Sequence, residues 1–212
     1  MTPHFPFLLF AGLSIMSSVP SEPKPQTLDD LLAHAGRYAE FSMRKLGRMP
    51  PTFFLIGADG PQMFMPENLD DEASKDDFAT SARLMCIAHA ATACVMALEA
   101  WAKFARQDEK LDLTEPPSEA FDRQEVVMLM GEDRAGQKQK LLPIVRSGNG
   151  NFFGFGEQNA PSLDAMQGRF AQILPPRTPA EKDRMLAQVM LRVKGVTAAT
   201  SPSGPSGSRP RR

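Results

Sequence analysis

The stretch MCIAHAATAC, Met85 to Cys94, lies in the middle of the longest amphipathic pattern in the chain. It holds both cysteines and one of the three histidines of the sequence, so it points more directly at chemistry than any other segment. Three interpretations fit its composition: a metal site, a redox site, or the middle of a helix that packs in the core. The periodicity around it distinguishes between them.

That periodicity predicts one long helix from about Glu72 to about Arg106, preceded by acidic residues that favour a helix N-terminus. On a helical wheel of about 100° per residue, Cys86 and Cys94 share the apolar half with Leu84, Ile87, Val95, Leu98, Trp101 and Phe104. His89 falls at the edge of the polar half, flanked by Met85 and Met96. The wheel therefore predicts inward-pointing thiols.

The same geometry argues against chemistry at the two cysteines. On one helix, Cys86 and Cys94 would be about 12 Å apart along the axis, too far for a disulfide. Cys94 would lie about 140° around the helix from His89, and a structural zinc requires four nitrogen or sulfur ligands. Free buried cysteines behave as small hydrophobic residues. The sequence therefore predicts core packing, with no metal and no cofactor.

Local signals elsewhere predict the remaining elements. Thr27 and Asp30 form a capping pair for a helix that ends near Gly47, and the runs 52–57 and 61–65 around Asp59-Gly60 predict a β-hairpin. The runs 125–133, 140–148 and 152–157 predict a three-stranded antiparallel meander. A capping box from Thr178 to Glu181 begins a last helix that ends near Lys194.

Together these elements predict an α+β fold in which helices pack on a five-stranded antiparallel sheet, in the order α-β-β-α-β-β-β-α. This order resembles that of the roadblock, longin and profilin-like folds. The chain carries none of the diagnostic motifs of those families, so the resemblance concerns topology and implies no function.

The chain is expected to form one domain over residues 26–194. Residues 1–25 are interpreted as a disordered leader or a mis-assigned start, with translation beginning at Met1 or Met16, and residues 195–212 as a disordered tail. The apolar run in 5–16 is too short to span a bilayer and lacks a preceding Lys or Arg. We therefore expect a cytoplasmic protein, with secretion by a weak signal as the alternative.

Composition limits the partners. The net charge is −1 and charged residues make up 23% of the chain, so no strong field attracts nucleic acid or an anionic membrane. Two cysteines do not make a disulfide framework, which fits a reducing compartment. The partner expected is another protein, of unknown identity, and the sequence leaves the oligomeric state open.

Three residues form the candidate polar cluster, should a site exist: Arg83, His89 and Glu125. Arg83 falls among apolar wheel positions, where it is interpreted as a snorkelling or ion-paired side chain, for example with Asp76, or as an anion-binding group in a pocket.

The glycines of GNGNFFGFGE lack the Lys-Ser/Thr of a phosphate loop. The acids of 70–77 do not match a calcium loop.

No nucleophile–base–acid arrangement is recognisable, so no catalytic residue is predicted. The first hypothesis is a small non-catalytic protein that acts through protein–protein contacts, using a Met85/Met96 edge, a mobile loop at 106–124 and the polar tail. The alternative is a ligand-binding or hydrolytic enzyme with a pocket around Arg83 and His89.

Overall fold

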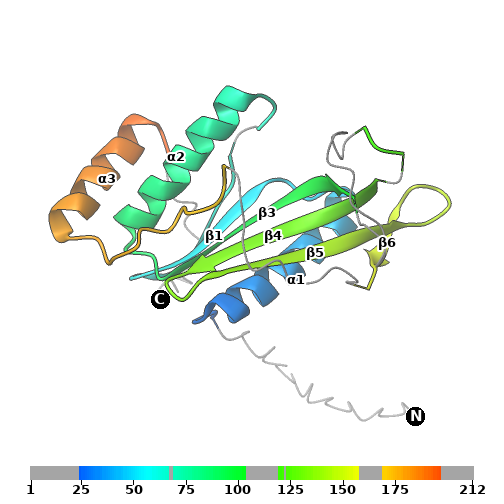
Figure 1. Cartoon of the computed structure of the whole chain (residues 1–212), viewed down its shortest axis with the longest axis horizontal. Helices are drawn as coiled ribbons and strands as arrows, with labels where there is room; N and C mark the ends of the chain where they lie inside the picture. The colour runs from blue at the N-terminus through cyan, green and yellow to red at the C-terminus, as the bar shows by residue number, and fades with distance from the viewer. Residues whose placement is uncertain (1–23, 67–68, 104–118, 122, 158–168, 197–212) are drawn as a thin grey trace, which may run out of the picture.

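The computed structural model describes residues 24–66, 69–103, 119–121, 123–157 and 169–196. A six-stranded antiparallel sheet forms the middle layer, with one helix on one face and two helices on the other (Figure 1). Most residues of the predicted leader (1–25), of the predicted tail (195–212) and of the predicted mobile loop (106–124) lie outside these ranges. No helix in the described part is both long and apolar enough to cross a membrane.

The first helix, α1 (Leu28–Leu46), covers one face of the sheet. Its predicted cap is confirmed, because the Thr27 hydroxyl accepts from the backbone N–H of Asp30 and the Asp30 carboxylate accepts from that of Thr27, both at 3.1 Å. Its apolar stripe packs on alternate residues of the central strands. Gly131 allows this close approach, since a Cβ there would lie 2.9 Å from Leu28 Cδ1.

The predicted hairpin is confirmed as β1 (Thr52–Gly57) and β2 (Gly60–Phe64). Strand β1 is buried on both faces, with Phe53 and Leu55 in the core beneath the two-helix layer and Phe54 and Ile56 in the core beneath α1. The predicted meander is also present, as β4 (Gln124–Asp133), β5 (Gln137–Arg146) and β6 (Phe152–Phe155).

The long helix predicted for residues 72–106 is wrong. Helix α2 spans Glu72–Ala88, and the chain then turns into β3 (Ala93–Ala102), which pairs with β1 and β4 in the middle of the sheet. The sheet therefore has six strands, in the order β2-β1-β3-β4-β5-β6, instead of five. The turn uses Ala90 with a positive φ of 48°, a conformation more usual for glycine.

The residues of β3 explain the error. Ala, Met and Leu favour helices, and Val95 is the one β-branched residue in the strand. Residues 93–97 are buried on both faces of the sheet, so their apolar run has no alternation that would distinguish a strand from a helix. Pairing with β1 and β4 outweighs the local helix propensity.

The last helix, α3 (Glu181–Val193), packs beside α2 (Figure 1). Its start differs from the prediction, since the N-cap is Ala180 and no side chain caps the helix. Ala187 and Leu191 are its buried residues, and the segment before it, which includes Ile173 and Leu174, completes the same core.

Candidate functional site

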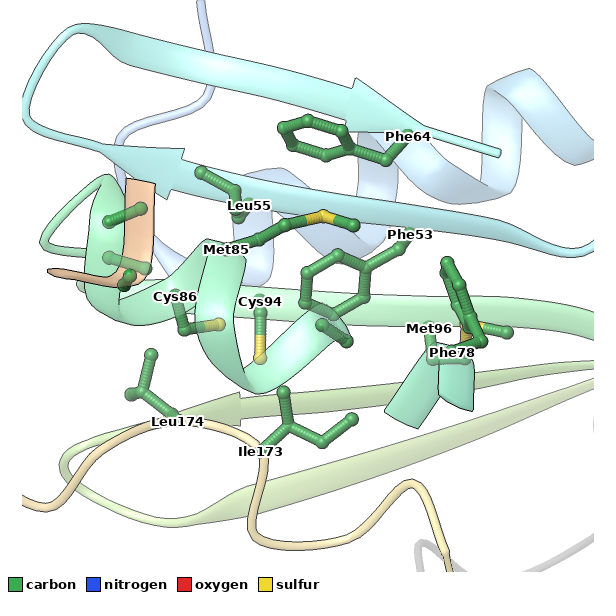
Figure 2. Packing of buried hydrophobic residues seen from close by; sticks show 14 of the residues in the cluster. Phe53, Leu55, Phe64, Phe78, Met85, Cys86, Cys94, Met96, Ile173 and Leu174 are labelled. Carbon is green, nitrogen blue, oxygen red and sulfur yellow. The ribbon is translucent and has the colours of Figure 1, made fainter. Parts of the chain in front are cut away.

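The two thiols contact each other between α2 and β3, contrary to the expectation that they are too far apart to pair. Figure 2 shows Cys86 on the helix and Cys94 on the strand with their sulfur atoms pointing into the same space. Both are free, and their exposed fractions are 0% and 3%. The two residues lie on different elements instead of on one helix, because the turn at 89–92 folds β3 back under α2.

A buried carboxylate lies beside this pair. Glu132 on β4 is in register with Cys94 on β3 and has an exposed fraction of 9%. Its Oε2 accepts from the backbone N–H of Ile173 at 3.0 Å. Burial raises the pKa of Glu132, although backbone N–H groups of Ile173 and Leu174 and the charge of Arg83 oppose the shift. The carboxylate therefore anchors the segment before α3 to the sheet.

This environment makes the Cys94 thiol a poor nucleophile. The pKa of the Cys94 thiol is raised well above its usual value by its hydrogen bond with Cys86, by burial, and by the charge of Glu132. A thiolate is the reactive form of cysteine, and reactive cysteines lie in electropositive, partly exposed places. Among the described residues, no group of three or more His, Cys, Asp or Glu side chains is arranged to hold a metal ion.

His89 lies at the end of α2, half-buried against the hairpin. The amide nitrogen of Gln62 lies within hydrogen-bond distance of Nδ1 of His89, at 3.0 Å. Burial lowers the pKa of His89, the nearby Arg184 lowers it further, and Asp59 acts in the opposite direction. The imidazole is therefore neutral at pH 7, and an amide instead of a carboxylate orients it.

The backbone at His89 fixes the end of α2 against β1. The His89 carbonyl accepts from the N–H of Ala58, and the N–H of Thr92 donates to the Ile56 carbonyl, both at 2.8 Å. Gly57 makes this docking possible, because a Cβ at this position would lie 2.8 Å from the His89 oxygen. These contacts give His89 a structural role at the junction of α2 and the hairpin.

The three residues of the candidate cluster do not form one site. Arg83 is exposed on α2, and its guanidinium donates to the Arg169 carbonyl at 3.3 Å instead of pairing with Asp76. Glu125 forms a two-pronged ion pair with Arg146, each bond 2.7 Å long. Glu125 also lies on the same face of β4 as Val127 and Leu129, which pack beneath α1. His89 instead contacts Phe64, which belongs to the core on the opposite face of the sheet.

The acidic start of α2 binds cations of the chain itself. Arg169 pairs with both Glu72 and Asp76, and Lys194, just after α3, pairs with Asp77. The hydrogen bonds and charges of Lys75 and Arg169 lower the pKa of Glu72 to about 2. These acids therefore tie the 169–174 segment and α3 to α2.

The outer side of α3 presents a row of large apolar side chains to solvent. Their exposed fractions lie between 44% and 84%, and the residues are Met185, Leu186, Val189, Met190 and Val193. Their spacing places them along one side of the helix, opposite Ala187 and Leu191. We call these five residues the α3 outer face.

The predicted contact edge at Met85 and Met96 is wrong, because each of these side chains is only 1% exposed. Met85 and Met96 belong to the core beneath α2. The exposed methionines Met185 and Met190 lie on α3 instead. The predicted position of the last helix is confirmed, and the 3.6-residue spacing of its apolar residues is the sequence signal for an uncovered side.

No protein family, curated protein or solved structure matches this chain. The function must therefore be inferred from the geometry alone.

Proposed function

We propose that this protein is a small non-catalytic α+β domain that binds another protein through the α3 outer face. The observation that carries the proposal is the exposure of the five apolar residues on α3. Large apolar side chains gathered on one surface are typical of protein–protein contact sites. Two of the five are methionines, which adapt to varied partner surfaces.

The chemistry of the remaining candidates supports the same proposal. The thiols are buried and the pKa of Cys94 is raised, His89 is oriented by an amide, and Glu125 is neutralised by Arg146. None of these arrangements positions a nucleophile, a base and an orienting acid together. The compartment we propose is the cytoplasm, where both thiols would stay reduced.

Site-specific photo-crosslinking in cells tests the proposal. A photoreactive amino acid at Val189 is expected to capture a protein of defined mass in high yield. The matched control carries the same group at Thr80, an exposed position on α2, and is expected to capture none in comparable yield. Equal crosslinking from both positions, or none from Val189, would reject α3 as the contact surface.

A further inference from the structure

We propose that the partner of the α3 outer face is a second copy of this chain, bound through antiparallel pairing of the two α3 helices. This inference rests on the proposed contact function of the same surface and names its occupant. A two-fold axis brings the same surface of both copies together, so the surface must complement itself. The α3 outer face meets this requirement in charge and in size.

The charges along one edge of α3 complement each other when two such helices run antiparallel. Glu181 and Asp183 lie in the first turn and Arg192 in the last. Glu181 and Arg192 are eleven positions apart, which places them within about 20° of each other around the helix, on one edge of the apolar row. In an antiparallel pair, this edge of one helix lies against the same edge of the other helix. The start of each helix then lies beside the end of the other.

Glu181, which pairs with Arg184 of its own helix at 3.0 Å, then also faces Arg192 of the other copy, so two oppositely charged pairs flank the apolar contact. A parallel two-fold pair would instead set this edge against the opposite edge of the second helix, so Glu181 and Arg192 would not meet each other. The antiparallel arrangement also brings opposite helix ends together.

The exposed area sets the expected size of the dimer interface. The exposed parts of the five apolar side chains amount to roughly 500 Å², which is within the range for the largest apolar patch of a typical monomer. Two copies would bury roughly 1,000 Å² of apolar surface, and more with the flanking charged residues, near the lower end for specific interfaces. An interface of this size fits a reversible dimer better than an obligate one.

Sedimentation velocity of the purified full chain between about 1 and 200 µM tests this inference. The wild type is expected to shift from monomer to dimer over this range. Leu186→Glu is expected to weaken association at least about tenfold, because it places a carboxylate in the apolar contact. Leu46→Glu is the matched control, since Leu46 and Leu186 are 62% and 60% exposed on different helices. The control should dimerise as the wild type does.

Charge exchange tests the antiparallel geometry. Arg192→Glu and Glu181→Arg are each expected to weaken self-association, because each places like charges opposite one another. An equimolar mixture of the two variants should recover the dimer, since every flanking pair is then opposite in sign. Circular dichroism of each variant checks that the fold is retained.

Three outcomes would overturn the inference: a wild type that stays monomeric at about 200 µM, a Leu46→Glu effect equal to that of Leu186→Glu, or no recovery in the mixture. Crosslinks from Val189 to residues 1–23 of the same chain would also overturn it. If the wild type is monomeric but Val189 still captures a different protein in cells, the contact function stands and the second copy is wrong. If neither is seen, both fail.

Discussion

Truncation of the two buried cysteines tests the fold at the turn where α2 becomes β3. Replacing Cys86 or Cys94 with Ala removes one sulfur atom of roughly 25 Å³, and at about 24 cal/mol per Å³ the cavity costs about 0.6 kcal/mol. The lost burial of the atom adds about 0.8 kcal/mol. Each single substitution should therefore lower the free energy of unfolding by about 1–2 kcal/mol.

The double variant is the informative one. Because the two sulfur atoms contact each other, each single substitution already removes that contact, so the double variant should cost less than the sum of the singles. A coupling of about 0.5–1 kcal/mol is expected for groups in contact. On a single helix the two residues would be about 12 Å apart and their effects would add.

Urea denaturation of the four proteins gives the coupling free energy directly. A control cycle combines Cys86→Ala with Ile144→Val, which lies in the core on the other face of the sheet. The control effects should add within about 0.5 kcal/mol. If the two cysteine effects add equally well, the sulfur contact and the placement of β3 beneath α2 would be refuted. Neither substitution should alter the metal content of the purified protein.

Two further perturbations test the junctions around the candidate residues. Gly57→Ala should lower the free energy of unfolding by about 1–3 kcal/mol, because the new methyl group would overlap the rigid backbone at His89. Gly148→Ala, where a Cβ meets no atom within 4 Å, should change it little, and equal thermal shifts for the two would contradict the docking of α2 on β1. Burial raises the folded pKa of Glu132 above its usual value of 4.5, so its contribution to stability is fully present below that pH and is lost as the pH rises through the raised pKa. The free energy of unfolding of the wild type minus that of Glu132→Gln, measured by urea denaturation from pH 4 to 8, should therefore fall with increasing pH. A difference that rises or stays flat would contradict the buried environment of this carboxylate.

Elements with local signals were predictable from the sequence. The Thr27 and Asp30 side chains cap the start of α1 through local hydrogen bonds that do not depend on where the helix packs. Gly47, with a φ of 71°, ends the helix. The strands of the hairpin and of the meander are joined by turns whose residues have strong turn preferences. In each of these cases the deciding interaction lies within a few positions along the chain.

The turn into β3 was not predictable in this way, because its cause is distant in sequence. Residues 93–97 become a strand through pairing with β1 and β4, and Ala90 gives no stop signal. The error also misplaced Arg83, since the apolar half of the wheel had been defined partly by residues of β3. The partners of Glu125 and His89 likewise come from remote segments, through Arg146 and Gln62.

Methionine oxidation footprinting tests the central claim most directly, which is that the α3 outer face is covered when the protein is at work. Met185 and Met190 are more than 40% exposed in the free chain, and Met65, on the hairpin, is 52% exposed and acts as the internal control. Mild peroxide treatment of dilute purified protein should oxidise all three. In intact cells the account predicts that Met185 and Met190 become several-fold more resistant while Met65 does not. Equal oxidation of the three residues in cells and in dilute solution would contradict it.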